Sequence, residues 1–175
     1  MNIELKYLDE IDPQQLAKHA NNQLINKYLR DSFPYPYTID HALNFIAYTI
    51  QNKNTEFAIV VDGVCVGCIG AKFNDDIYKY NCEIGYWISP IYWNKGIMSF
   101  VVNLFCFYLF NHYNIHKIYA EVFLENIGSY RVLLKNGFQE EGHFIEHVYK
   151  NGEFKDIVLL GLRREVFEYK KNYSL

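Results

Sequence analysis

The chain has 175 residues, half of them hydrophobic, which is enough to bury a core in one domain without disulfides or a structural metal. Its net charge is −3 with acidic and basic residues interspersed, so no basic face points to nucleic-acid binding. The first residues lack a basic segment followed by an apolar core, and the longest apolar run, 97–110, is too short to span a bilayer. We therefore expect one cytoplasmic domain over residues 1–175, with no nucleic-acid or membrane partner.

The first third of the chain predicts one strand followed by helices. Residues 3–8 alternate apolar and polar side chains, which is typical of a strand. Asp12-Pro13 marks a helix start, because the aspartate can cap the helix and proline suits its first position. We expect this helix to reach about Asn22, and a second short helix to reach about Arg30.

The next segment combines an aromatic loop with a helix. Residues 33–37 read Phe-Pro-Tyr-Pro-Tyr and cannot form regular structure, because each proline biases its predecessor toward an extended backbone. This loop is either one wall of a binding cleft or ordinary surface packing. Thr38 can cap the following helix, which is predicted from apolar positions that recur at helical spacing: Ile39, Leu43, Ile46 and Ile50.

A hairpin is predicted around Asp62-Gly63, a two-residue turn signal between strands 56–61 and 64–73. The second strand carries Cys65 and Cys68, a spacing that also occurs in zinc and redox sites. Because side chains alternate across a strand, this spacing predicts that the two cysteines point to opposite faces. No second pair of cysteines or histidines completes a zinc site, so we expect reduced, buried thiols and no metal.

The stretch from Cys82 to Ser99 predicts a strand, a short loop and a helix. Cys82–Ile88 is rich in aromatic and β-branched residues and is expected to be the third strand of an antiparallel meander. The apolar run from 97 to about 110 predicts a helix with one stripe formed by Ile97, Val101, Leu104 and Tyr108. Its other faces are almost as apolar, so we expect it to be buried on more than one side.

This strand–loop–helix connection also predicts an anion site. The free N–H groups of the first helical turn and the positive end of the helix dipole point at one place, and phosphate is the usual ligand there. Gly96 lets a ligand approach the backbone, and Lys95 adds a charge. The alternative is a plain turn with a permissive glycine. The sequence contains neither a Walker loop nor a Gly-x-Gly-x-x-Gly motif, which argues against a nucleoside triphosphate or a dinucleotide bound in the usual way.

The last third begins with a strand over residues 115–123 and a helix capped by Asn126. The helix carries Tyr130, Leu133 and Leu134 and should end at Gly137-Phe138, where a glycine followed by an apolar residue is typical of a left-handed cap.

A second hairpin is predicted from strands 138–149 and 154–161 around the Asn151-Gly152 turn signal. His143 and His147 would share a face of its first strand, but no further ligand-type residue accompanies them, so they predict surface residues rather than a metal site. Residues 163–175 predict a short terminal helix and a frayed tail.

Two motifs together resemble those of the GNAT superfamily of acyl-CoA-dependent N-acetyltransferases. The first, Glu83–Ile88 followed by Trp93–Met98, is similar to the family's fourth strand and pyrophosphate loop. The second, Asn126-x-x-Ser129 with Lys-Asn-Gly-Phe at 135–138, is similar to its second cofactor-contacting helix. The aromatic loop at 33–37 and the Asn-x-x-Ser form resemble the branch that contains ribosomal-protein N-terminal acetyltransferases.

The resemblance implies a mixed α/β (α+β) fold, with a central, mostly antiparallel, twisted sheet of about six or seven strands flanked by about four or five helices. It also implies acetyl-CoA as the co-substrate, a primary amine as the acceptor, and no metal. The oligomeric state stays open, with a homodimer as one alternative.

The same resemblance implies which residues hold acetyl-CoA. Backbone N–H groups of the loop and first helical turn would bind the pyrophosphate, the strand end would pair with the pantetheine arm, and the second motif would lie near the thioester. The residues implied in cofactor binding are Trp87, Ile88, Trp93, Asn94, Lys95, Gly96, Ile97, Met98, Ser99, Asn126 and Lys135.

The chain departs from the family pattern at three positions. Trp93 replaces the usual Gln or Arg, and Met98 replaces a small residue; both are compatible with binding through backbone groups. The tyrosine that many relatives use to protonate the leaving thiolate would fall at Leu133, so Ser129 is the substitute acid that the resemblance favours. Glu83 is the candidate base.

Each of these roles has a structural alternative. Glu83 suits a solvated strand position, and Asn126 and Ser129 suit the cap and first turn of a helix without any ligand. Lys135, near the end of that helix, can simply complement its dipole.

The implied reaction is direct acyl transfer, in which a neutral amine attacks the thioester. An α-amine with a pKa of about 8 costs about 1.4 kcal/mol to deprotonate at neutral pH, whereas a lysine-like amine costs about 4.6 kcal/mol. A site without an obvious strong base therefore favours a peptide N-terminus or an amino-sugar. The alternatives are an aminoglycoside or polyamine acetyltransferase, and a non-catalytic acyl-CoA-binding module.

Overall fold

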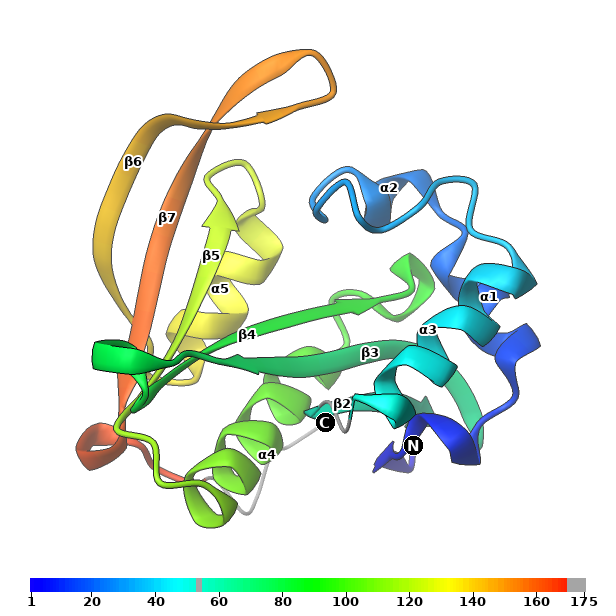
Figure 1. Cartoon of the computed structure of the whole chain (residues 1–175), viewed down its shortest axis with the longest axis horizontal. Coiled ribbons are helices and arrows are strands. Elements are labelled where there is room, and N and C mark those ends of the chain that lie inside the picture. The colour runs from blue at the N-terminus through cyan, green and yellow to red at the C-terminus, as the bar shows by residue number, and fades with distance from the viewer. Residues whose placement is uncertain (53–54, 170–175) are drawn as a thin grey trace. The chain divides into compact units, whose positions relative to one another are not determined.

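The computed structural model describes residues 1–52 and 55–169 (Figure 1). Its strands are β1 Ile3–Lys6, β2 Thr55–Val61, β3 Val64–Phe73, β4 Asn81–Ile88, β5 Lys117–Phe123, β6 Gln139–Lys150 and β7 Glu153–Arg163. Its helices are α1 Pro13–Ala20, α2 Gln23–Asn26, α3 Ile39–Gln51, α4 Ile97–His112 and α5 Ile127–Lys135.

The strands form one seven-stranded sheet in the order β1-β2-β3-β4-β5-β7-β6. The pairs β1–β2, β2–β3, β5–β7 and β6–β7 are antiparallel, and β4–β5 is parallel. The predicted mixed, mostly antiparallel sheet with flanking helices is therefore confirmed. Contacts divide the chain into two compact units, the first of residues 1–71 and 85–97, the second of residues 72–84 and the chain from Met98 onward. Strands β3 and β4 each contribute to both units.

The first unit contains β1, β2 and the helices α1 to α3. The predicted caps are present: the Asp12 carboxylate accepts from the Gln14 N–H at 2.8 Å, and the Thr38 hydroxyl accepts from the His41 N–H. Helix α2 ends at Asn26, before the predicted Arg30. Small residues, among them Ala17, Ala20 and Ala42, line the core where α1 and α3 pack together.

Helix α3 forms as predicted, but only one of the four apolar positions that indicated it is buried. Ile46 is buried, but Ile39, Leu43 and Ile50 are 39%, 49% and 53% exposed. The helix buries Ala42, Ile46 and Thr49 instead, because a close contact with α1 selects a face that carries small side chains.

The β2–β3 hairpin turns at Asp62 and Gly63 as predicted, both with positive φ (48° and 82°). The prediction that Cys65 and Cys68 point to opposite faces is wrong. Ile59 pairs with Gly67 and Val60 with Cys65, so Val66 is an extra residue in β3 and this bulge resets the alternation. Both cysteines are buried in the same apolar cluster, and burial raises the pKa of Cys65 to about 11.

Backbone hydrogen bonds at both ends of the β3–β4 pair show that these strands are antiparallel, as predicted. The Ser89 N–H, after the end of β4, donates to the Val66 carbonyl near the start of β3. The Asn74 N–H, after the end of β3, donates to the carbonyl of Asn81 at the start of β4. The parallel pairing of β4 with β5 joins residues 81–83 to residues 117–119.

Helix α4 is the main buried element of the second unit. Residues on several of its faces are buried, as its apolar composition predicts: Val101, Val102, Phe105, Cys106, Leu109 and Phe110. Burial, and then the nearby Cys82 on β4, raise the pKa of the Cys106 thiol, so α4 packs on the face of the sheet to which Cys82 points. Asn103, buried in this apolar helix, donates its amide to the carbonyl of Glu168 in the C-terminal segment at 3.2 Å.

Helix α5 begins and ends as predicted. The Asn126 side chain accepts from the Ser129 N–H at 3.2 Å. At the other end Gly137 has a φ of +85°, the Phe138 N–H donates to the Leu133 carbonyl, and the Gly137 N–H donates to the Leu134 carbonyl. These two bonds close the last turn in the manner typical of a left-handed glycine cap.

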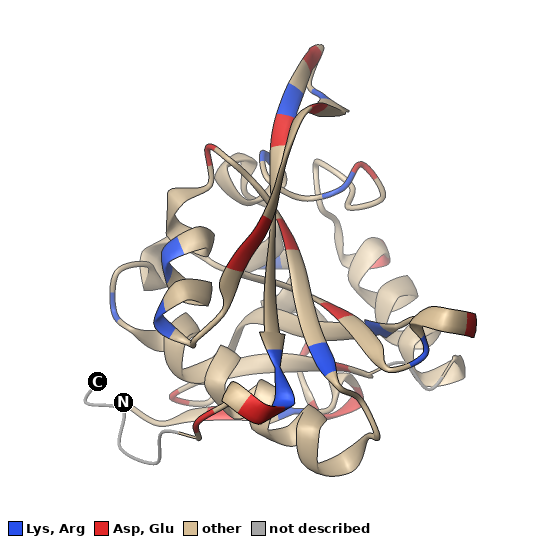
Figure 2. Ribbon diagram, turned by 90° about the vertical axis from the view of Figure 1, so that its left-hand side faces the viewer, with Lys and Arg blue, Asp and Glu red and all other residues tan. Residues whose placement is uncertain are grey.

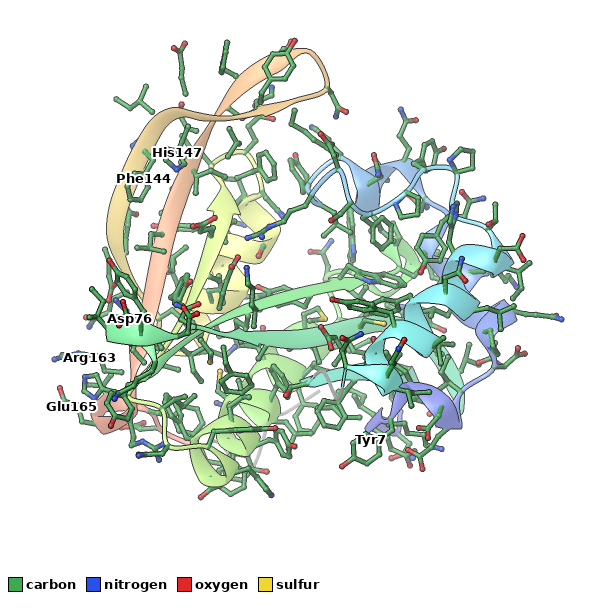
Figure 3. All side chains as sticks on the ribbon, in the orientation of Figure 1. Tyr7, Asp76, Phe144, His147, Arg163 and Glu165 are labelled. Carbon is green, nitrogen blue, oxygen red and sulfur yellow. The ribbon has the colours of Figure 1, made fainter. Side chains whose placement is uncertain are left out.

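The β6–β7 hairpin extends beyond the end of β5, since β5 pairs with β7 only from Ile157 to Arg163 (Figures 1 and 2). Its Asn151-Gly152 turn is as predicted. The register shifts between Phe144 and Val148, so the alternation that would place His143 and His147 on one face is interrupted. His143 pairs with Asp156, and the rings of Phe144 and His147 lie 5.0 Å apart (Figure 3).

The C-terminal segment contains a 3-10 turn at Arg164–Val166 where a short helix was predicted, and residues 170–175 of the predicted tail lie outside the described residues. In the described ranges, no helix is both long and apolar enough to cross a membrane. Within the same ranges, no group of three or more His, Cys, Asp or Glu side chains could hold a metal ion.

Candidate active site

The end of β4 is fixed tightly against β3 in the first unit. A Cβ at Gly67 would lie 2.3 Å from the Trp87 carbonyl oxygen, so only glycine permits this approach of the two backbones. Ile88 is buried, and the Trp87 indole packs edge-on against the Phe33 ring with centroids 5.9 Å apart. The strand end that the motif assigns to the pantetheine arm therefore has two contacts: its backbone packs against β3, and its Trp87 side chain packs against the aromatic loop.

The loop after β4 folds back on the strand it leaves. Residues 90–92 form a 3-10 turn, and the Trp93 indole N–H donates to the Ile88 carbonyl at 2.9 Å. This bond explains the first departure from the motif, because Trp93 closes the loop with its own side chain. The sequence gives the aromatic residue but not this bond, which depends on how the turn brings Trp93 back to the strand.

Two residues of the loop have left-handed backbones just before α4. Asn94 has a φ of 59° and Gly96 a φ of 76°. Such residues turn successive N–H groups toward one side of the chain, which is how backbone anion sites are made. The Lys95 ammonium lies 5.3 Å from the Tyr92 ring centre, and its residue is exposed.

The start of α4 differs from the other helix starts. Side chains accept hydrogen bonds from the first turns of α1, α2, α3 and α5, at Asp12, Asn22, Thr38 and Asn126. The residue before α4 is Gly96, which has no side chain with which to cap. Since the N–H groups of a first helical turn have no acceptor within the helix, those of Ile97, Met98 and Ser99 are suited to a ligand.

The second unit carries the candidate base on the face of the sheet opposite to α4. Cys82 points toward α4, so its neighbour Glu83 points the other way. Glu83 pairs with Tyr119 on β5, whose hydroxyl and the Asn74 side chain are 3.1 Å apart. Glu121 lies two residues beyond Tyr119 and therefore on the same face as Glu83. Sequence spacing could not show this second carboxylate, because it depends on the register of β4 and β5.

The second motif forms the start of α5. Its cap bond brings Asn126 and Ser129 together, and Ser129 is partly exposed. Leu133 is completely buried, so the position of the usual tyrosine acid is part of the core. Tyr130, one turn earlier, donates its hydroxyl to the Glu140 carboxylate at 2.9 Å, and this bond raises the pKa of the phenol. Ser129 therefore stays the candidate acid.

The end of α5 holds two further polar residues. Lys135 is exposed in the last turn, where it complements the helix dipole, and nothing in the geometry assigns it to a cofactor. Asn136, which the sequence analysis did not select, is buried and donates its side-chain amide to the Ser99 carbonyl in the first turn of α4. A polar residue before a capping glycine is a common pattern, so the sequence contained no signal for this long-range contact.

Comparisons with known proteins find similar chains and a similar fold. A family model described as "Acetyltransferase (GNAT) domain" matches residues 2–139. The chain is 28% identical over 157 residues to the spermidine N(1)-acetyltransferase of Vibrio cholerae, with 89% of each chain covered. It is 28% identical over 176 residues to a putative ribosomal N-acetyltransferase of Bacillus subtilis, covering 97% of this chain and 96% of the relative. The crystal structure of the Vibrio cholerae spermidine N-acetyltransferase with CoA and spermine matches with a TM-score of 0.76 and 26% identity, over 93% of this chain and 96% of that one.

Proposed function

Because the chain belongs to the GNAT acetyltransferase family, whose members transfer the acetyl group of acetyl-CoA to amines, we propose that its acceptor is the α-amine of a protein N-terminus. The observation that carries this proposal is the burial of Leu133, which closes the position of the usual tyrosine acid. The remaining acid and base candidates, Ser129 and Glu83, are weak. Such a site suits the amine that loses its proton most easily, and an α-amine costs about 3 kcal/mol less to deprotonate at neutral pH than a lysine-like amine.

In this proposal the loop and the start of α4 bind the acetyl-CoA pyrophosphate. The left-handed residues Asn94 and Gly96, and the lack of a capping side chain at Gly96, support backbone binding, and Lys95 supplies one charge. Backbone binding is compatible with Trp93 and Met98 at their positions. Trp87 and Ile88 would pair with the pantetheine arm through their backbone groups, and Asn126 would lie near the thioester.

The chemical step forms one bond and breaks one. The neutral amine attacks the thioester carbonyl carbon, backbone donors stabilise the oxyanion, and the C–S bond breaks to release coenzyme A. Glu83 would take the proton that the amine loses, and Ser129 would give a proton to the thiolate while regaining one from solvent.

Glu83→Gln tests the proposed base. The rate should fall most at low pH, where the amine must lose its proton, and recover as pH rises toward the pKa of the amine. Tyr119→Phe, a change to the neighbouring residue that leaves the carboxylate in place, should retain the wild-type pH profile. A Glu83→Gln profile that superimposes on the wild type would remove Glu83 from the reaction.

A polyamine is the second candidate acceptor. Glu83 and Glu121 share one face of the sheet, and two carboxylates on one face favour a substrate with several positive charges. The similarity to spermidine N(1)-acetyltransferase supports the same alternative.

The acceptor is tested by comparing a peptide with a free N-terminus, the same peptide with a blocked N-terminus, spermidine and an aminoglycoside under identical conditions. We expect the free peptide to be acetylated fastest and the blocked peptide to be inert. Glu121→Gln should leave the peptide rate unchanged if the peptide is the substrate, and should lower kcat/KM for spermidine if the polyamine is. Faster turnover of spermidine or the aminoglycoside would overturn the proposal of an α-amine acceptor. Equal rates for the free and the blocked peptide would do the same. If none of these amines causes acetyl-CoA to be consumed, the remaining alternative is a non-catalytic acyl-CoA-binding module.

A further inference from the structure

Asn136 is a buried polar residue at the end of α5. Its side chain is almost fully enclosed, with the residue only 4% exposed. The side-chain nitrogen donates to two backbone carbonyls, that of Val132 at 2.9 Å and that of Ser99 at 3.1 Å. Burying an amide costs free energy unless it is hydrogen-bonded, so this side chain is held in one orientation by its partners.

One of these two hydrogen bonds stays within α5, and the other reaches α4. The bond to Val132 is local and belongs to the C-terminal turn of α5. That turn is already closed by the N–H groups of Gly137 and Phe138, so it does not require a partner from another helix. The bond to Ser99 spans 37 residues and reaches the third residue of α4. It therefore constrains α4 rather than α5.

The carbonyl that accepts this bond lies within the first turn of α4. Ser99 is itself buried, and its carbonyl shares a peptide plane with the N–H of Phe100. A donor on that carbonyl resists tilting of the peptide plane, and so limits rotation of the neighbouring amides at the helix start. The N–H of Ser99 itself is one of these neighbours, and in the proposed function it faces the pyrophosphate.

We propose that Asn136 is a positioning residue for acetyl-CoA: it fixes the first turn of α4 so that its N–H groups are oriented before the ligand arrives. This inference rests on the proposed assignment of the pyrophosphate to that turn. Preorganised donors bind an anion more tightly because their orientation costs nothing at the moment of binding. Loss of the tether should therefore weaken acetyl-CoA binding without altering the chemical step.

A matched control exists in the same helix. Asn103, one turn after Ser99, is also buried and also donates its side-chain amide to a distant backbone carbonyl, that of Glu168. Like Asn136, it is a buried amide that joins α4 to a distant segment, but its contact lies further from the helix start. A purely structural contribution predicts equal consequences for the two residues, whereas positioning predicts a difference in acetyl-CoA affinity alone.

The test compares Asn136→Leu, Asn136→Asp and Asn103→Leu, each well below its unfolding temperature. Asn136→Asp keeps the shape of the side chain but replaces the donating amide by an acceptor. We expect both Asn136 variants to weaken acetyl-CoA binding by calorimetry, and to raise its KM, about tenfold, with kcat and the KM of the amine unchanged. Asn103→Leu should lower thermal stability while acetyl-CoA affinity stays at the wild-type value. Equal affinity losses in Asn136→Leu and Asn103→Leu, or none in the Asn136 variants, would overturn the inference.

Two further measurements separate the possible failures. Gly96→Glu should abolish acetyl-CoA binding: if it does and the Asn136 variants bind normally, only the positioning role is lost, whereas normal binding by Gly96→Glu refutes the pyrophosphate site itself. If the Asn136 variants do not fold, the wild-type protein still decides. Its Asn136 side-chain amide resonances should shift on addition of coenzyme A while those of Asn103 do not, and an unmoved Asn136 signal would refute the role.

Discussion

The two ends of α4 are built in opposite ways. At its C-terminal end, the Arg164 guanidinium donates to the carbonyls of Phe110, Tyr113 and Ile115 at 2.5, 2.8 and 2.8 Å. At its N-terminal end the preceding residue is Gly96, which offers no side chain to the first turn. Helix ends leave carbonyls or N–H groups without intrahelical partners, and at the C-terminal end of α4 the Arg164 side chain is such a partner.

This difference indicates where the helix depends on the protein and where it can depend on a ligand. Arg164 places a positive charge at the negative end of the dipole, and it donates to the Phe110 carbonyl in the last turn and to two carbonyls just after the helix. In the proposed function, the N–H groups at the start of α4 and the positive end of the dipole bind an anion. Mutations at the C-terminal end of α4 should therefore lower stability, whereas mutations at its N-terminal end should weaken acetyl-CoA binding.

Replacement of Gly96 should have the largest effect. A β-branched residue is strained at a φ of +76°, and its side chain would occupy the space proposed for the pyrophosphate. We expect Gly96→Val to weaken acetyl-CoA binding at least about 100-fold, close to 3 kcal/mol, as measured by calorimetry.

Gly63 provides the control for backbone strain. It lies in the β2–β3 turn with a φ of +82°, and a Cβ there would meet nothing within 4 Å. Gly63→Val should therefore lower stability without changing acetyl-CoA affinity. If both variants bind acetyl-CoA equally well, the N-terminal end of α4 is not the phosphate site.

Removal of Arg164 should have the next largest effect, on stability alone. Arg164→Ala leaves three carbonyls without their charged donor and should cost about 2–3 kcal/mol in urea unfolding. Arg163→Ala is the matched control, because its guanidinium pairs with Glu165 at 2.7 Å on the exposed surface, where such a pair contributes about 0–1 kcal/mol (Figure 3). Weaker acetyl-CoA binding by folded Arg164→Ala would contradict the separation of the two ends.

Local signals in the sequence predicted the ends of α5 and the turns of both hairpins. Asn126, Gly137 and the Asp62-Gly63 turn each depend on a few neighbouring residues, so their conformations could be inferred without the fold. The strand–loop–helix at 82–99 was likewise predictable, because glycine, proline and apolar runs mark its boundaries.

Features that join distant parts of the chain could not be predicted in this way. The bulge at Val66 reversed the expected arrangement of two cysteines, since it arises from the pairing of β3 with β2. The contacts of Arg164 with residues 110–115 and of Asn136 with Ser99 join segments separated by 37 or more residues. At the site, residue types were predictable from the motifs. The bond from the Trp93 indole to the Ile88 carbonyl required the loop conformation, and the shared face of Glu83 and Glu121 required the register of β4 and β5.

Ser129 extends the comparison to a helix start that is capped. Ser129→Ala keeps the backbone N–H that donates to Asn126, so the cap and the thermal stability should be unchanged. If the hydroxyl protonates the leaving thiolate, kcat should fall about tenfold at every pH with unchanged acetyl-CoA affinity, because a thiol with a pKa near 8.5 needs only modest help to leave. Wild-type turnover in Ser129→Ala would mean that solvent supplies this proton.

Lys95 should have the smallest effect at the open end of α4. Its ammonium is exposed and lies 5.3 Å from the Tyr92 ring centre, so in water it adds only a screened attraction to a phosphate bound by backbone groups. We expect Lys95→Gln to weaken acetyl-CoA binding about threefold at low ionic strength and to match the wild type near 1 M salt, where charges are screened within about 3 Å. Lys79→Gln is the control, because the Lys79 ammonium lies at a similar distance, 5.4 Å, from the Tyr80 ring in a different turn. It should leave affinity unchanged at every salt concentration. A loss in Lys95→Gln that persists at high salt would mean that the ammonium forms a direct, desolvated contact, and that the backbone of the open helix end is not the main ligand of the phosphate.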